Sequence, residues 1–566
     1  MNQTPTSSTL RHWVTATIQQ ATTLRTFFAG LLIPCGFAPI HMPGLAILGI
    51  ALLFAQLNQK NRGRVDHSSS EGLRPTTCSR DREILLNAQH DCTEIDRAGS
   101  REHVAGRRDS NAQQILKKSF QTGFVFGLGY FGLGISWLYV SIHNYGHLNA
   151  PLSAFITFLF VSYLALFPGL VAMLYQRLAV KSSLIFNCFL FSAVWCLGEF
   201  LRATFLTGFP WLLLGVGQFD TPLKYLLPIM GVFGVSFFTC LAATCLAASV
   251  QATREKRSPW IIACVVILIA PLLLKNHEWT KTHSPDISVG VIQANISMRD
   301  KWDEQLFWQI LEKYEHEAVQ LIGKKQLIIM PESAIPVPIN YVSDFLNELD
   351  RRAKQGGSAI LFGIPEPTST DDTAYYNTLA SVGTAQGSYL KQHLVPFGEF
   401  IPKVFQQLST LLALPAANLK SGANQQSLVT VQHHPIASLI CYEVAYPELL
   451  RSQLPKAEWI VSISDDGWFG HSLAVYQQLQ MSQVLSMQTG RFQIVANNDG
   501  LSSVINAQGD VVDSLPVFSS GILNASIRSA TGASPWVYLG DMPVLLISLI
   551  VVFMGFLFLF RQSRKP

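Results

Sequence analysis

Long apolar runs dominate the first half of the chain. The run Thr26–Gln59 carries no charge and is broken at Pro39, His41 and Pro43, which predicts two helices joined by a tight turn. A helix needs about 20 apolar residues to cross a bilayer core. The pattern therefore predicts seven transmembrane helices before residue 280 and an eighth near the C-terminus. The further runs are Ser119–Ile142, Pro151–Tyr175, Leu184–Phe200, Tyr225–Val250, Pro259–Leu274 and Pro543–Phe560.

The pattern changes between about residues 282 and 540. Short apolar runs typical of buried strands recur there, with helical patterns such as Trp302–Ile322 and Val342–Gly356 between them. Strands that alternate with helices indicate an α/β domain. We therefore expect a membrane domain over 1–280, an extracytoplasmic α/β domain over 281–540, and the eighth helix with a cytoplasmic tail over 541–566. The predicted strands are Ile287–Gln293, Leu327–Met330, Ala359–Gly363, Ala437–Cys441 and Trp459–Ile463.

Lysine and arginine are unevenly distributed among the loops. Lys60–Lys118 holds twelve of them, whereas Ser141–Ala150 holds none. Further Lys and Arg residues that bear on the topology lie in Gln176–Ser183, in Gln251–Ser258 and in the tail Arg561–Pro566. Cytoplasmic loops carry the excess of Lys and Arg. We therefore expect the N-terminus and the tail in the cytoplasm and Lys275–Asp541 outside. The mixed-charge stretch 58–118 is predicted to be a flexible cytoplasmic insertion.

Composition supports this picture and excludes other classes of protein. Hydrophobic residues make up 49% of the chain and charged residues only 14%, against about 25% in soluble domains. A net charge of +4 over 566 residues gives no broad cationic surface, so no nucleic acid is expected as a partner. The nine cysteines show no zinc-binding spacing. The sequence therefore predicts no metal site.

Three residues in the second half are candidates for chemistry, and two of them lie at the ends of apolar runs. Cys441 ends the run that begins at Ile436, Glu332 follows Leu327–Met330, and Lys391 lies in a segment that also contains Glu399. Taken singly, a free cysteine is usually core filler and a strand-end charge is usually structural. Together, a carboxylate can accept the thiol proton and an ammonium can stabilise an oxyanion. The three residues are therefore candidate catalytic groups.

The motifs around these residues resemble a known family. Pro-Glu332-Ser, Lys391-x-His-Leu-Val-Pro-Phe-Gly-Glu399 and Ile-Cys441-Tyr-Glu are similar to those of the nitrilase superfamily. The resemblance implies an αββα sandwich. The fusion to seven preceding helices and one following helix resembles the apolipoprotein N-acyltransferases, the membrane-embedded branch found in the bacterial inner membrane. The resemblance covers nearly the whole chain, although the stretch after the second helix is longer than expected for the family.

The resemblance implies a two-step acyl transfer without a cofactor. Cys441 would attack the sn-1 ester of a phospholipid and form a thioester. The amine of a diacylglyceryl-cysteine at the N-terminus of an apolipoprotein would then take the acyl group. Glu332 would be the general base and Lys391 would stabilise the oxyanion. The catalytic domain would lie on the periplasmic side of a multi-pass inner-membrane protein.

Further residues are carried over by the same resemblance. Glu399 would orient Glu332 or Lys391. Tyr442, Glu443, Trp302 and Trp468 are candidate residues lining the site, with ordinary packing as the alternative interpretation. They complete the set of predicted supporting and substrate-binding residues.

Two segments outside the triad have an open interpretation. Glu199 and Arg202 lie one turn apart, either as a functional intramembrane group or, as we favour, as a structural ion pair at the membrane edge. The segment Lys403–Leu419 has an apolar face, which is typical of core packing or of an arm that dips into the lipid interface. We favour the arm, because both expected substrates are lipids.

Two alternative functions stay open at the level of the sequence. A membrane-tethered amidase would use the same triad with water as the acceptor, but a single helix would suffice as its tether. A non-enzymatic transporter would need charged residues along its helices. The runs Ser119–Ile142, Pro151–Tyr175 and Tyr225–Val250 contain none, which argues against a transporter.

Overall fold

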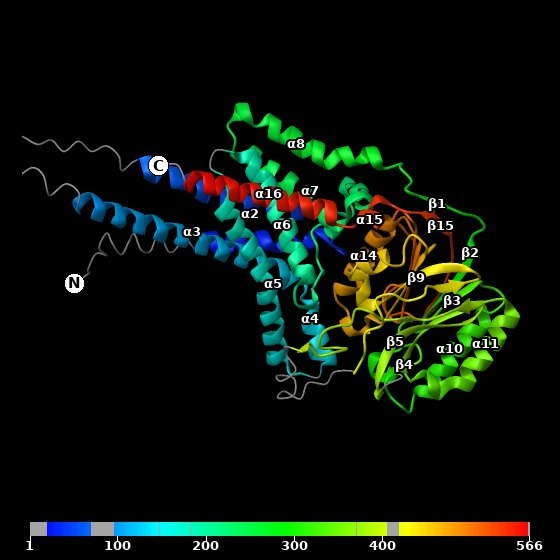
Figure 1. The fold of residues 1–566 in the computed structure, drawn as a ribbon. Helices are drawn as coiled ribbons and strands as arrows, with labels where there is room; N and C mark the ends of the chain where they lie inside the picture. Colours follow the sequence, from blue (N-terminus) through cyan, green and yellow to red (C-terminus); the bar gives the residue numbers. More distant parts are fainter. Residues whose placement is uncertain are drawn as a thin grey trace, which may run out of the picture.

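The fold is described from a computed structural model, which describes residues 20–69, 95–146, 148–180, 183–368, 371–403 and 418–563. A helical region and a β-sandwich lie on opposite sides of the molecule (Figure 1). The last helix returns to the helical region and packs mainly on α6. The long helices are α2 (Pro43–Ser69), α3 (Ile95–Gly134), α5 (Ala150–Leu178), α6 (Leu184–Thr204), α7 (Leu227–Gln251), α8 (Ser258–Ile269) and α16 (Met542–Ser563).

The number of membrane-spanning helices differs from the prediction of eight. Within the described residues, five helices are long and apolar enough to cross a membrane: those within 150–178, 184–207, 222–251, 254–274 and 542–561. A sixth is formed if α3 and α4 (Trp137–Val140), which are bent by 55°, count as one span. At the N-terminus the break near Pro39 and Pro43 is present, but the apolar helix Pro43–Gln59 is short. Eight crossings are therefore not confirmed.

The described parts of the charged stretch 58–118 continue two helices. The C-terminal end of α2 and the N-terminal part of α3 enter the stretch from either side, and 70–94 lie outside the described residues. The predicted arm also lies almost wholly outside them, because only Lys403, Asn418 and Leu419 of that segment are described.

The second half of the chain forms the predicted αββα sandwich. One sheet has the order β14-β2-β3-β4-β5-β7, with β2, β3 and β4 parallel. Its strands are Gly521–Ile527, Ile287–Gln293, Leu327–Ile329, Ala359–Thr368, Asp371–Gly383 and Tyr389–Leu390. The other sheet has the order β13-β12-β11-β10-β9-β8-β6, with β9, β10 and β11 parallel. Its strands are Val511–Ser514, Ser503–Ile505, Gln493–Asn497, Ile460–Ser464, His434–Ile440, Val429–Val431 and Ala385–Gln386.

Alternating side chains explain the layers. In β3, Leu327 and Ile329 join the core between the sheets, while Ile328 faces α10 (Phe307–Leu321) and α11 (Ser343–Gly356) on the outer side. On the other sheet, α14 (Ala474–Thr489) packs over β11 and β12. The shorter elements are β1 (Thr280–Thr282), β15 (Ala530–Gly532), α9 (Met298–Lys301), α13 (Glu448–Arg451) and α15 (Pro535–Leu539).

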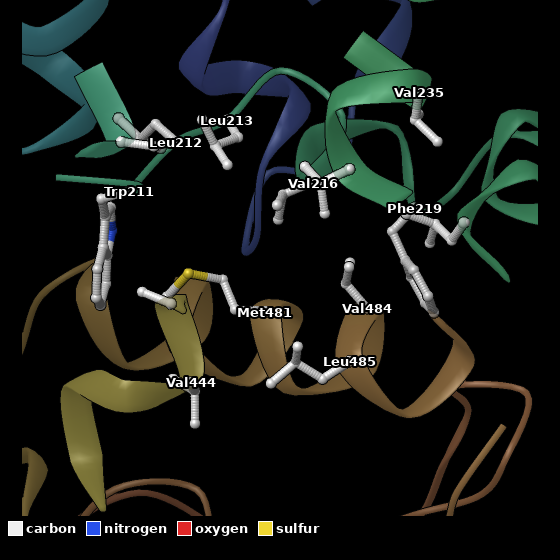
Figure 2. Packing of buried hydrophobic residues seen from close by; sticks show 14 of the residues in the cluster. Trp211, Leu212, Leu213, Val216, Phe219, Val235, Val444, Met481, Val484 and Leu485 are labelled. Atoms are coloured by element: carbon white, nitrogen blue, oxygen red, sulfur yellow. The ribbon is translucent and has the colours of Figure 1, made fainter. Parts of the chain in front are cut away.

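Helix α14 joins the sandwich to the helical region. Its side chains Met481 and Val484 face the segment from Trp211 to Phe219, while Leu485 lies on the side of Val444 (Figure 2). The buried residues form one continuous cluster that runs from the apolar helices into the space between the sheets. The two parts of the chain therefore share a core, and the strand ends of the sandwich are held close to the helical region.

Candidate active site

Glu332 is delivered by the carboxyl end of β3, three residues after Ile329. Its side chain is buried, and Asn377 Nδ2 donates to its Oε1 at 2.7 Å. The backbone N–H of Asp465 donates to its Oε2 at 3.0 Å. Burial raises the pKa of Glu332 and the nearby Glu399 adds to this, while Lys391 and Asn377 oppose it. A carboxylate with a raised pKa is a better proton acceptor near neutral pH.

Lys391 follows β7 and is completely buried. Its Nζ lies 2.7 Å from Glu399 Oε1 and 3.5 Å from Glu332 Oε1. Burial alone would lower its pKa, but the carboxylates of Glu399 and Glu332 outweigh burial and raise it. Lys391 is therefore a fixed cation that faces both carboxylates and the cysteine.

Cys441 lies at the carboxyl end of β9, at the first position of a short 3₁₀ helix, Cys441–Ala445. Its φ of 55° places a residue with a side chain in the left-handed region, which is sparsely populated outside glycine. Burial raises the pKa of the thiol well above its usual value, and Glu332 raises it further, while Lys391 lowers it. The resting thiol is therefore neutral, and a reaction at sulfur needs a base to take its proton.

Glu399 and Asn377 complete the polar group around Lys391. Glu399 Oε2 accepts from the Val395 N–H at 2.7 Å, which fixes the loop on which Glu399 lies. Asn377, on β5, donates to Glu332 and weakly to Glu399, at 3.4 Å. The predicted role of Glu399 as an orienting residue is consistent with this geometry. Asn377 was not predicted, because nothing in the sequence distinguishes an inward-facing amide in a strand from an exposed one.

Glu443 is placed differently from the other predicted residues. Its fully buried carboxylate accepts from the backbone N–H groups of Gln392 (2.7 Å), His393 (2.9 Å) and Ile440 (2.8 Å) and from the Tyr389 hydroxyl. Burial raises its pKa to about 7, against the effect of these donors. Glu443 therefore ties the end of β9 to the segment that carries Lys391, rather than presenting its carboxylate as a lining group.

A second buried charge pair supports Glu332 from behind. Lys301 Nζ binds Asp465 Oδ2, and both side chains are buried. Asp465 Oδ1 also accepts from Asn498 Nδ2 at 3.2 Å. This pair fixes the loop after β10 whose N–H group donates to Glu332. Of this loop, the resemblance to the family carried over Trp468 but not Asp465, so the role of Asp465 was not predicted.

The aromatic residues carried over from the family take two kinds of position. Tyr442 is buried and stacks on Trp211 with ring centroids 6.3 Å apart. Trp302 and Trp468 are about half exposed, at 53% and 46%. The Trp468 ring lies against Tyr145 of the helical region. The two tryptophans are therefore accessible, whereas Tyr442 belongs to the packed layer behind the cysteine.

Two family models match the chain, one for each half. Residues 110–245 match the apolipoprotein N-acyltransferase N-terminal domain, and residues 288–534 match carbon-nitrogen hydrolase. An apolipoprotein N-acyltransferase of Coxiella burnetii is 36% identical over 447 residues, covering 76% of this chain and 90% of that protein. The chain belongs to the apolipoprotein N-acyltransferase family. A relative of the same name from Pseudomonas syringae is 34% identical over 455 residues, covering 79% of this chain and 88% of that protein.

Solved structures show a more distant likeness. The NitFhit protein of C. elegans matches with a TM-score of 0.35 and 14% identity, over 50% of this chain and 66% of that one. An amidase from Nesterenkonia matches with a TM-score of 0.32 and 16% identity, over 44% of this chain and 92% of that one.

Membership of the apolipoprotein N-acyltransferase family confirms the resemblance noted in the sequence. It also confirms that the chain is an enzyme of the acyltransferase class with a carbon-nitrogen hydrolase domain. Within the described residues, no group of three His, Cys, Asp or Glu side chains is arranged to hold a metal ion. The roles of individual residues are taken up below as proposals.

Proposed function

We propose that this enzyme transfers an acyl chain from the sn-1 position of a phospholipid to the N-terminal amine of a diacylated apolipoprotein, through a thioester on Cys441. The observation that carries the proposal is the convergence of a strand-end thiol, a buried carboxylate of raised pKa and a buried lysine from the two sheets of one sandwich. The names of the relatives supply the donor and acceptor classes.

In the first half-reaction Glu332 takes the thiol proton as Cys441 Sγ attacks the ester carbonyl carbon. The negative charge that develops on the carbonyl oxygen is stabilised by Lys391 and by the backbone N–H of Tyr442. The C–O bond of the ester then breaks, and the departing glycerol oxygen receives the proton from Glu332. A lysophospholipid leaves and the acyl group stays on sulfur.

In the second half-reaction the free amine of the apolipoprotein attacks the thioester carbon. Glu332 accepts a proton from the attacking nitrogen, the C–S bond breaks, and the proton returns to Cys441. A thioester reacts readily with amines, whereas direct aminolysis of an ester is slow, so the covalent intermediate divides one difficult step into two easier ones. The buried Lys391 keeps its charge throughout, because two carboxylates face it.

The membrane arrangement is part of the same proposal. Both substrates carry acyl chains and reside in the bilayer, so a catalytic sandwich that shares a core with transmembrane helices meets them at the membrane surface. We propose eight crossings, with Lys275–Asp541 on the periplasmic side of the inner membrane. The support is the excess of Lys and Arg in the opposite loops.

Intact-mass analysis of the detergent-solubilised protein tests the proposed function. Incubation with phospholipid should add one acyl group, and a diacylated lipopeptide should then remove it with formation of the N-acylated peptide. Cys441→Ala should acquire no acyl group, while Cys35→Ser should behave like the wild type, since Cys35 lies in the short helix Pro34–Gly36 of the helical region and not at a strand end of the sandwich. Discharge to water at the same rate with or without the lipopeptide would indicate a hydrolase instead, and acylation of Cys441→Ala would exclude the thioester.

A further inference from the structure

A buried arginine in the helical region binds the turn that reaches the nucleophile. Arg202, near the end of α6, is 2% exposed. Its Nη1 donates to the carbonyl oxygens of Phe209 and Trp211, both at 2.7 Å, and its Nη2 donates to that of Leu212 at 3.3 Å. One guanidinium therefore binds three of the four carbonyl groups in the turn Phe209–Leu212, which has no regular secondary structure.

Glu199 binds the same turn one helical turn earlier on α6. Its Oε1 accepts from the Leu214 N–H at 2.8 Å. The sequence favoured a structural ion pair between Glu199 and Arg202. In the structure no ion pair joins these two described residues, because each side chain binds backbone groups between Phe209 and Leu214 instead. Arg202 still acts on Glu199 through its charge, without a direct ion pair between the two side chains.

The conformation of the turn needs this support. Leu212 has a φ of 55°, an unfavourable backbone conformation for a residue with a side chain. Gly208 has a φ of 79°, and a Cβ there would lie 1.9 Å from the Ala203 carbonyl oxygen, so the chain folds back tightly on the end of α6. The turn therefore stores strain that the hydrogen bonds from Arg202 and Glu199 offset.

On its other side the turn contacts the residues next to Cys441. The Trp211 ring is fully buried and lies nearly parallel to that of Tyr442, at 15°. Trp211 Nε1 donates to Gln477 Oε1 of α14 at 2.6 Å, and the Tyr446 hydroxyl donates to the Gly208 carbonyl oxygen at 3.1 Å. Figure 2 shows Trp211 reaching from the helical region towards α14 and the segment that carries Val444.

We propose that Arg202 is a positioning residue for Cys441, because it holds the Phe209–Leu212 turn so that Trp211 stacks on Tyr442 and fixes the peptide that follows the nucleophile. This inference rests on the proposed function. Cys441 itself has the strained φ. The peptide that follows it supplies the Tyr442 N–H, which is proposed to stabilise the oxyanion. On the side of the sandwich, Glu443 accepts from the Ile440 N–H just before Cys441. On the side of the helical region, the Trp211 ring packs on the Tyr442 ring just after it. Misplacement of a reacting group by about 1 Å can cost a factor of about 10² in rate.

The test measures the rate of acyl transfer to Cys441 at saturating phospholipid, by intact mass, in the full-length protein. Arg202→Lys keeps the charge but not the planar fork that meets three carbonyls. It should slow acyl-enzyme formation by about 10-fold to 100-fold at saturation, with little change in the phospholipid concentration that gives half-maximal rate. Trp211→Leu should slow it similarly, because the stack on Tyr442 is lost.

Arg491→Lys is the matched control. Arg491 is equally buried and donates to the carbonyl oxygens of Ala457, Pro455 and Gly532, but it contacts no residue of the turn or the triad. It should lower thermal stability without slowing the acylation of folded protein. Equal slowing in Arg491→Lys and Arg202→Lys would mean that general destabilisation explains both, and would overturn the proposal.

A double-mutant cycle shows whether Arg202 acts through Trp211. If it does, Arg202→Lys combined with Trp211→Leu should be no slower than Trp211→Leu alone. Additive losses of acylation rate in the double variant would overturn the inference. A Trp211→Leu variant that acylates at the wild-type rate would also overturn it, and this result is decisive even if Arg202→Lys does not fold. A wild-type protein that gains no acyl group on Cys441 would instead refute the proposed function.

Discussion

At the residue scale, the site separates the groups that hold charge from the group that exchanges a proton. Lys391 is buried between Glu399 and Glu332 and keeps its proton. The Cys441 thiol is neutral because burial raises its pKa well above its ordinary value. Glu332 lies beside the thiol and also has a raised pKa, so it can accept the thiol proton and release it again.

We predict that Glu332 sets the acid limb of the pH–rate profile. Acyl-enzyme formation should fall as the pH falls through the pKa of Glu332, which lies above the ordinary carboxyl value of 4.5 because the side chain is buried. Glu332→Gln should slow acylation by about 10²–10⁴-fold and remove the limb. The measurement is the rate of acylation of Cys441 between about pH 4 and 9.

Asn377→Leu serves as the companion variant to Glu332→Gln. It removes a hydrogen bond that stabilises the charged carboxylate, so the acid limb should move to higher pH while the rate at high pH changes little. An acid limb that is unchanged in both variants would show that another group titrates there, and the assignment of Glu332 as the base would be wrong.

At the element scale, the sequence predicted the strands that precede Glu332 and Cys441, but neither β7, which precedes Lys391, nor the contacts between the strands. The runs Ile287–Gln293 and Leu327–Met330 correspond to β2 and β3 within one residue, because strands buried on both faces read as continuous apolar runs. Cys441 was predicted at a strand end and lies there. The pairing of two sheets, and with it Asn377 and Asp465 beside Glu332, depends on contacts between distant segments that no local pattern encodes.

Glu443 illustrates the same limit, and its contacts give a prediction. The sequence carried it over as a lining residue, but its carboxylate receives hydrogen bonds from Tyr389, Gln392, His393 and Ile440. The amide of Glu443→Gln has only one acceptor oxygen, so buried donors would lose their partner at a cost of about 1–3 kcal/mol. We expect a lower midpoint of thermal unfolding, measured by circular dichroism.

Glu448→Gln is the control for this substitution. Glu448 is exposed and forms an ion pair with Arg451, so its loss should change stability by less than about 1 kcal/mol. If Glu443→Gln unfolded at the wild-type midpoint, the carboxylate would not tie the two segments together, and its interpretation as a lining residue would have to be taken up again.

At the scale of the whole molecule, the distribution of Lys and Arg predicts the topology. A reporter that is active only in the periplasm should work when fused within 275–541 and fail when fused within 58–118 or after Arg561. A reporter active only in the cytoplasm should give the opposite pattern. Periplasmic activity of a fusion within 58–118 would reverse the assignment and place the catalytic domain in the cytoplasm.

The shared core gives the last prediction, which concerns cooperativity. Buried residues connect the transmembrane helices, the segment from Trp211 to Phe219, α14 and the space between the sheets without a break (Figure 2). Two parts that share a core this way are expected to unfold together, as a single small domain does. Thermal unfolding in detergent should therefore expose thiols of both parts at one temperature.

Maleimide labelling with peptide mass analysis measures the unfolding of both parts in a single sample. Cys441 reports on the sandwich, and Cys196 and Cys240 report on α6 and α7; all three thiols are buried in the folded protein. Met481→Ala, at the junction, should destabilise the protein by about 2–5 kcal/mol. Ile310→Ala, on the buried face of α10, should lower the labelling midpoint of all three cysteines equally. If Ile310→Ala lowered the midpoint of Cys441 alone, the sandwich would unfold by itself, and the junction would be a contact between two independent domains.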